Sequence, residues 1–219
     1  MLADLVLLVR RPLQALRTIE LDRSLFQGLI GLSLSVVLPG LVSELAGLAP
    51  FRPPAQLGSL PSLTAQGADL YARWSYQNRF LLPMYGILIS AVLWVLAVLL
   101  IHGIARALRG QGDFRGFLRL AGYIALLGLV ALPVGVLDAL ARIQGDATLA
   151  AATGQLTGVV AVGILLWQNL LLIYAARLHY RISTERAVAA VVGPIGGVVV
   201  IGLALVVVAA ILFVVSQQA

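Results

Sequence analysis

The chain has 219 residues, of which 61% are hydrophobic and only 11% charged, and it contains no cysteine. A soluble domain of this composition would expose far more apolar surface than water tolerates, so the sequence indicates an integral membrane protein. The lack of cysteine excludes disulfides, thiol chemistry and Cys-ligated metal.

The first predicted element is an amphipathic helix over residues 1–23. At 100° per residue one face collects Leu2, Leu5, Val6, Val9, Leu13 and Leu16, and the other collects Asp4, Arg10, Arg11, Gln14, Arg17 and Thr18. A helix of this kind lies in the membrane interface, parallel to the surface. Pro12 either kinks it or begins a second short helix, where a missing backbone donor costs nothing.

Five apolar stretches follow, each near or above the ~20 residues that a helix needs to cross the hydrocarbon. They cover residues 25–44, 80–105, 120–139, 156–176 and 187–215, and residues 49–79 form an outer loop. The expected fold class is therefore all-α: one membrane domain over residues 1–219, built as a five-helix transmembrane bundle with an N-terminal interfacial helix.

Prolines and small residues mark where these spans bend and pack. Pro39, Pro133 and Pro194 each permit a kink, which neighbouring helices can compensate. Small residues at a spacing of four let helix backbones approach closely, and this pattern occurs at Gly154/Gly158, Ala131/Gly135 and Gly193/Gly197.

The arginines predict the orientation. Five crossings place 11 of the 15 on one side of the bilayer: Arg23, together with Arg10, Arg11, Arg17, Arg106, Arg109, Arg115, Arg119, Arg177, Arg181 and Arg186. Four acids cancel the four arginines of the other side, so the whole formal net charge of +6 falls on the first side. By the positive-inside rule that side is cytoplasmic, with the amino terminus inside and the carboxy terminus outside. All basic residues are arginine, which hints at a bacterial inner membrane protein from a GC-rich genome.

Apart from Arg23, these cytoplasmic arginines are the candidate contacts for anionic lipid headgroups or for a protein partner. A nucleic-acid partner is not expected, because the arginines lie beside span ends without interleaved aromatic residues. A membrane or cytoplasmic protein partner and a homo-oligomer both remain open.

Few polar side chains lie within the spans. Gln168 and Asn169 sit deep in the fourth span, where each amide is expected to bond to a neighbouring helix, with substrate contact as the alternative. Asp138 and Arg142 have the i, i+4 spacing of a helical ion pair, with an ion- or proton-coordinating role for Asp138 as the alternative. Glu44 ends the first span.

No catalytic, cofactor or metal site is predicted. No known catalytic motif combines a nucleophile with a base in the sequence, and neither His102 nor His179 has a second ligand at i+3 or i+4. The sequence therefore favours a protein that is not an enzyme.

Four motifs agree with one known layout. They are Arg11-Pro12 in the amphipathic segment, Gly110-Gln-Gly-Asp-Phe114 between the second and third spans, Gly122-Tyr123 at the start of the third, and the polar loop 179–187 before a proline-containing last span. The chain thus resembles the Yip family of five-span membrane proteins. The resemblance implies a non-catalytic scaffold or adaptor in membrane organisation, trafficking or assembly of partners. The alternative is a small transporter or channel that uses the kinked helices and the polar residues of the fourth span.

Overall fold

The computed structural model describes residues 2–51 and 62–194, and all regular elements within them are helical. Four helices in this part are long and apolar enough to cross a membrane. The expected all-α membrane bundle is thereby confirmed. Of the fifth predicted span, only residues 187–194 are described, as helix, and the rest lies outside the described residues.

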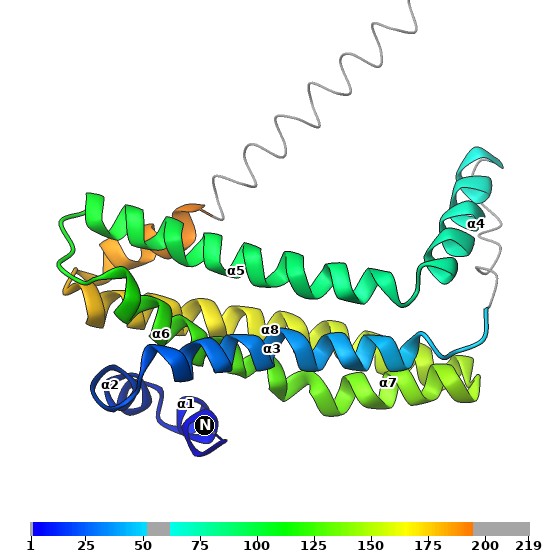
Figure 1. The fold of residues 1–219 in the computed structure, drawn as a ribbon, viewed down its shortest axis with the longest axis horizontal. Helices are drawn as coiled ribbons and strands as arrows, with labels where there is room; N and C mark the ends of the chain where they lie inside the picture. The colour runs from blue at the N-terminus through cyan, green and yellow to red at the C-terminus, as the bar shows by residue number, and fades with distance from the viewer. Residues whose placement is uncertain (1, 52–61, 195–219) are drawn as a thin grey trace, which may run out of the picture.

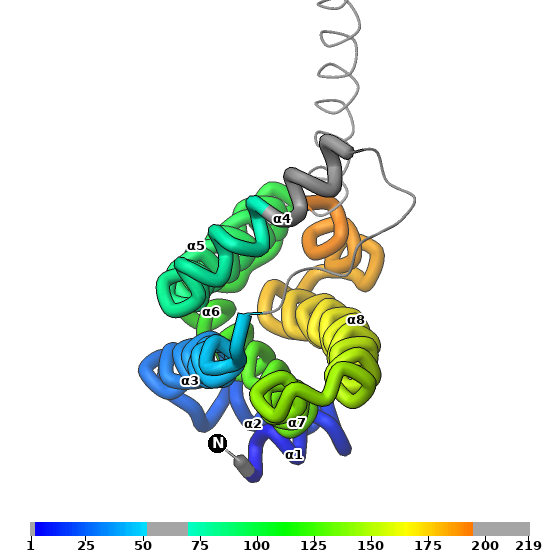
Figure 2. The backbone as a smooth tube through the Cα atoms, turned by 90° about the vertical axis from the view of Figure 1, so that its right-hand side faces the viewer, coloured from blue at the N-terminus to red at the C-terminus, as the bar shows by residue number. Residues whose placement is uncertain are grey.

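The described residues contain eight complete α-helices, one 3₁₀ segment and a further helical stretch at residues 184–194. In order, the complete elements are α1 (Leu2–Arg10), α2 (Pro12–Asp22), α3 (Leu25–Ala46), α4 (Ser62–Gln77), α5 (Leu81–Ala107), α6 (Phe114–Ala125), the 3₁₀ segment η1 (Leu126–Ala131), α7 (Leu132–Gln144) and α8 (Ala147–Tyr180). Figure 1 shows α3, α5, α7 and α8 running alongside one another, with α1 and α2 lying across the start of α3. Figure 2 looks along this bundle and shows α6 among the longer helices.

The third span is broken rather than kinked. It runs from Phe114 to Gln144 and changes from α to 3₁₀ geometry over η1, just before Pro133. Pro133 has no backbone N–H to donate to the Leu129 carbonyl, and the N–H of Leu132 donates to that oxygen instead. The tighter 3₁₀ turn thus satisfies the carbonyl that the proline leaves free.

The fourth span extends well beyond the predicted residues 156–176. α8 has 34 residues and begins at a capped end, where the N–H of Leu149 donates to Asp146 Oδ1 over 2.9 Å. Thr148 and Thr153 lie in this added N-terminal part, which is less apolar than the predicted span.

Glycines bring α3 and α6 into backbone contact. A Cβ on Gly122 would overlap the carbonyl oxygen of Gly28, and one on Gly31 would come within 2.8 Å of the Gly122 carbonyl oxygen. The expected pair in the fourth span does not serve this purpose, because Gly158 has open space around it and a Cβ on Gly154 would make only ordinary contacts. Close helix packing therefore occurs in this structure at Gly28, Gly31 and Gly122.

Candidate functional site

The arginine-rich end of the bundle is the end formed by α1, α2, the connection of residues 108–113 and the C-terminal turn of α8 (Figure 1, left). Side-chain hydrogen bonds join these segments to one another across large sequence separations. All 11 arginines that the sequence assigned to one side lie on these segments or directly beside them. The structure thus gathers them at one place in the fold.

The amphipathic segment is two helices. Arg11 has a non-helical backbone with φ −142° and ψ 67°, and Pro12 begins α2, which is the second of the two alternatives that the sequence left open. Leu8, Leu16 and Ile19 are fully buried against the bundle, whereas Val9 and Leu13 are about half exposed. The apolar face is therefore shared between the protein and its surroundings.

Asp4 does not lie on the polar face where the sequence placed it. Its residue is only 5% exposed, and Arg23 Nη2 donates to its Oδ1 over 2.7 Å. Burial alone would raise the pKa of Asp4, but hydrogen bonding and nearby positive charge, with the hydrogen bond from Arg23 as the largest contribution, outweigh it and lower the pKa below its usual 3.8. The pair ties α1 to the residue that ends α2, just before α3.

This ion pair predicts acid-sensitive docking of α1. A carboxyl group with a lowered folded pKa stabilises the fold above its unfolded pKa and loses that contribution as the pH falls through the folded value. The mobility of a spin label at Val9 should stay constant from pH 7 down to about 4.5 and rise at lower pH. In Asp4→Asn the label should already be mobile at pH 7. An identical acid transition in Asp4→Asn would contradict this assignment.

Arg119 caps the C-terminus of α2. Its Nη2 donates to the Glu20 carbonyl over 2.7 Å and its Nη1 to the Arg23 carbonyl over 2.9 Å. The last carbonyls of a helix have no intrahelical partner and carry negative partial charge, so a guanidinium is well suited to them. Arg119, expected to contact lipid or a partner, is instead engaged within the protein.

His179 joins three segments at this end. Its Nδ1 lies 3.1 Å from Glu20 Oε1 on α2, and its Nε2 lies 2.8 Å from the carbonyl oxygen of Asp113. Both neighbours have oxygens that accept hydrogen bonds, and the ring nitrogen that carries the proton is the one that donates. His179 thus ties α8 to α2 and to the connection that precedes α6.

The glycine-rich turn is packed rather than flexible. A Cβ on Gly112 or Gly116 would collide with the His179 ring, and the N–H of Gln111 donates to the Tyr180 carbonyl over 3.0 Å. Asp113 caps α6 by accepting from the Gly116 N–H, a hydrogen bond that lowers the pKa of Asp113. The turn therefore fixes the start of α6 against the end of α8.

An aromatic cluster lies beneath this turn. Phe117 and Tyr180 are fully buried with ring centroids 5.2 Å apart, and the Tyr180 hydroxyl lies 2.8 Å from His102 Nδ1. Sequence reasoning considered His102 and His179 as metal ligands and found no second ligand at i+3 or i+4 of either. The Asp113–Gly116 capping spacing was readable in the sequence, but the contacts among α2, α5, α6 and α8 depend on the fold.

The other candidate arginines face outward. Nine are exposed: Arg10, Arg11, Arg17, Arg106, Arg109, Arg115, Arg177, Arg181 and Arg186. Two of the nine also brace the local backbone, since Arg106 donates to the Gly110 carbonyl over 3.0 Å and Arg186 to the Leu108 carbonyl over 3.3 Å. This end is therefore a strongly cationic surface.

The opposite end holds the predicted ion pair. Arg142 Nε donates to Asp138 Oδ2 over 2.8 Å, and Thr153 Oγ1 on α8 donates to Asp138 Oδ1 over 3.0 Å. Thr153 was not among the predicted polar contacts, and its hydrogen bond converts a pair within α7 into a link to α8. Glu44 lies half-buried in the last turn of α3.

The side-chain amides of Gln168 and Asn169, deep in the fourth span, donate to different kinds of acceptor. Gln168 Nε2 donates to the carbonyl oxygens of Ile124 and Ala125 over 3.4 and 3.3 Å, which joins α8 to the place where α6 gives way to η1. Asn169 does not make the expected interhelical bond, because its Nδ2 donates to the Leu165 carbonyl of its own helix over 2.8 Å. Of the two, Gln168 is the one that connects helices.

A comparison with models of protein families matches almost the whole chain. The model of the Yip1 domain matches residues 6–215. The chain belongs to the Yip1 domain family. This confirms the resemblance drawn from the four sequence motifs. The search of curated proteins and the search of solved structures returned no match.

Family membership and the four long apolar helices together make this Yip1 domain protein a multi-pass membrane protein. The glycine-rich turn holds α6 against α8, and Gly122 of the Gly-Tyr pair lies in the α3–α6 backbone contact. Two of the motifs that carried the resemblance thus have structural roles in the packing of the bundle.

Proposed function

We propose that this protein is a non-catalytic membrane scaffold or adaptor whose arginine-rich end faces the cytoplasm. The observation that carries the proposal is the cationic surface itself: nine exposed arginines surround two interfacial helices that are bonded to the bundle. Such a surface attracts anionic headgroups, and any partner recruited there is expected to carry complementary negative charge.

The two interfacial helices support the proposal through their exposed apolar residues. Val9 is 50% exposed and Leu13 56% exposed, close to Arg10, Arg11 and Arg17. Apolar side chains beside exposed arginines are what a helix presents when it lies at the boundary between headgroups and acyl chains. The hydrogen bonds of Arg119 and His179 keep the two helices fixed to the bundle while their exposed apolar face contacts the lipid.

The test uses the full chain in nanodiscs with a spin label at Leu13. With anionic phosphatidylglycerol in the disc, the label should be accessible to oxygen and shielded from a water-soluble nickel chelate. Neutralising Arg10, Arg11 and Arg17 to glutamine should weaken headgroup association by about a hundredfold, since each charge contributes ~1 kcal/mol near an anionic surface. The label should then become accessible to the chelate.

The matched control removes three charges from the other end, through Arg73→Gln, Arg79→Gln and Arg142→Gln. It should leave the label at Leu13 unchanged. Equal chelate accessibility in the wild type and in the Arg10/Arg11/Arg17 variant would contradict the proposed lipid contact. A reporter inserted at Gln111 should report the cytoplasmic side, and a signal from the opposite side would overturn the orientation.

The transporter alternative finds less support in the geometry. The Gln168 amide is bonded to backbone carbonyls and Asn169 to its own helix, so neither offers its N–H groups freely to a solute. Gradient-driven uptake into proteoliposomes that disappears in Gln168→Leu would nevertheless favour transport over the scaffold role. With both amides structural, we expect no such uptake, and Gln168→Leu should cost only ~1 kcal/mol of stability.

A further inference from the structure

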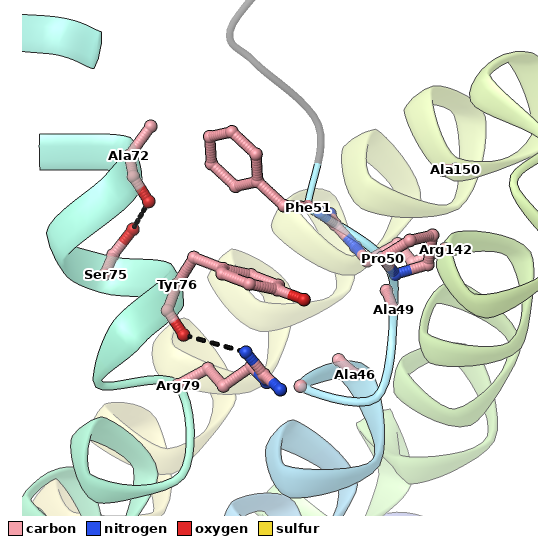
Figure 3. A pocket seen from close by; sticks show the side chains of 11 residues that line it. Ala46, Ala49, Pro50, Phe51, Ala72, Ser75, Tyr76, Arg79, Arg142 and Ala150 are labelled. Atoms are coloured by element: carbon pink, nitrogen blue, oxygen red, sulfur yellow. Dashed lines mark hydrogen bonds between the residues drawn. The ribbon is translucent and has the colours of Figure 1, made fainter. Parts of the chain in front are cut away.

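A cavity of about 410 Å³ opens at the end of the bundle opposite the arginine-rich end. Its walls come from the end of α3 and the segment after it, from α4 and the turn that follows, and from α7 and α8. Figure 3 shows Tyr76 and Arg79 reaching in from the α4 side and Arg142 lying on the α7 side. Among the described residues, two arginines and no acidic residue line the cavity.

Contacts with neighbouring residues hold the guanidinium of Arg79 in place, and not all of its N–H donors are used. It lies 4.1 Å from the centroid of the Tyr76 ring and 4.9 Å from that of Phe80, and its Nη1 donates to the Tyr76 carbonyl over 3.2 Å. Its Nε is buried and has no hydrogen-bond partner in the described part of the chain. No hydrogen bond from its Nη2 is seen within the described part of the chain, so the N–H groups of this nitrogen remain available to an oxyanion in the cavity.

Arg142 contributes a second guanidinium group, and only some of its hydrogen-bond donors are used. Only its Nε donates to Asp138, and no hydrogen bond from either terminal nitrogen is seen among residues 2–51 and 62–194. Its side chain is half exposed, so the terminal nitrogens remain accessible from the cavity. The Asp138 carboxylate, held by Arg142 and Thr153, neutralises one of the two positive charges and leaves an excess of positive charge at the cavity.

From these contacts we propose that the cavity binds one phosphate group, between Arg79 and Arg142, with the Tyr76 hydroxyl as a further donor. Guanidinium groups present planar pairs of N–H donors that match phosphate oxygens, and aromatic stacking has already fixed the orientation of Arg79. The cavity lies at a bundle end, the level at which phospholipid headgroups meet a membrane protein. The phosphate therefore belongs either to a phospholipid or to a free phosphate ion. The proposal does not depend on the function assigned to the arginine-rich end.

The experiment titrates the full chain in detergent micelles with two separate probes. The first probe is inorganic phosphate, followed by the line width of its ³¹P resonance. The second probe is phosphatidylglycerol, counted as retained lipid by native mass spectrometry. Arg79→Gln and Arg142→Gln should each weaken binding of the preferred probe by about tenfold, the change expected for one lost charge-assisted hydrogen bond. The matched control Arg73→Gln removes a charge from α4 outside the cavity lining and should leave the affinity unchanged.

Two further variants separate binding from folding. Arg79→Lys keeps the charge but loses the planar fork, so its affinity should fall between that of the wild type and that of Arg79→Gln. Tyr76→Phe removes only the hydroxyl and should weaken binding about fivefold. Thermal unfolding of every variant is recorded alongside, and if Arg79→Gln does not fold, Arg142→Gln and Tyr76→Phe decide the question.

The outcomes are distinct. Arginine-dependent retention of phosphatidylglycerol alone identifies a lipid headgroup, and arginine-dependent binding of inorganic phosphate alone identifies the free ion. Either result supports the site, as does dependence with both probes. The proposal is overturned if the folded cavity variants bind both probes as the wild type does, or if Arg73→Gln lowers the affinity as much as Arg79→Gln.

Discussion

Replacing Gly122 by alanine is expected to destabilise the bundle by about 3 kcal/mol, the upper range for overpacking a tightly packed interior. The added Cβ would overlap the carbonyl oxygen of Gly28. This neighbour is backbone and cannot rotate away, so α3 and α6 must move apart. Their separation would weaken contacts along both helices, and the loss should appear as unfolding at a lower SDS fraction, followed by circular dichroism.

The matched control is Gly158→Ala on α8, where an added Cβ would meet nothing within 4 Å. Alanine favours helix over glycine by about 0.5–1 kcal/mol, so this change should be neutral or slightly stabilising. If the two alanine variants unfold at the same SDS fraction, the α3–α6 backbone contact is not the feature that holds the bundle together.

Arg119→Met should release the two interfacial helices from the bundle. Methionine has no donor, so the carbonyls of Glu20 and Arg23 both lose their guanidinium partner. Each lost partner costs about 1–3 kcal/mol where water cannot replace it. Hydrogen exchange of α2 amides should therefore accelerate about a hundredfold or more, while exchange in α5 stays unchanged.

Two comparisons sharpen this result. Arg115→Met removes an exposed arginine from the same helix and should leave exchange in α2 as it is in the wild type. Arg119→Lys keeps a charged donor but reaches only one carbonyl well, so its exchange rate should be intermediate. Unaltered α2 protection in Arg119→Met would mean that buried Leu16 and Ile19 hold the helix without the cap.

The helices and the grouping of charge were predictable from sequence because both rest on local patterns. Apolar runs of membrane length predicted the spans, and the alternation of these runs with arginines predicted the common end. Pro12 and Pro133 were located correctly as interruptions. That Pro133 produces a 3₁₀ segment rather than a kink depends on how Leu132 bonds to Leu129, which no periodicity records.

The cross-links between segments were not predictable in this way. Glu20 and His179 are 159 positions apart, and Arg119 lies 99 positions from Glu20, so nothing local relates them. The same limit explains Asp4, which a helical wheel assigns to water although Arg23 neutralises it inside the protein. In the fourth span a wheel cannot tell Gln168, which faces η1, from Asn169, which bonds within its own helix.

The length of α8 sets how this protein matches the thickness of its bilayer. Its 34 residues extend about 51 Å at the rise of an α-helix, against a hydrocarbon core of about 30 Å. The helix must therefore tilt or carry its first turns beyond the acyl chains, where Thr148 and Asp146 can be hydrated. Because Gln111 holds its other end to the connection before α6, the surplus length falls on the Asp146 side, and hydrophobic mismatch would be relieved there.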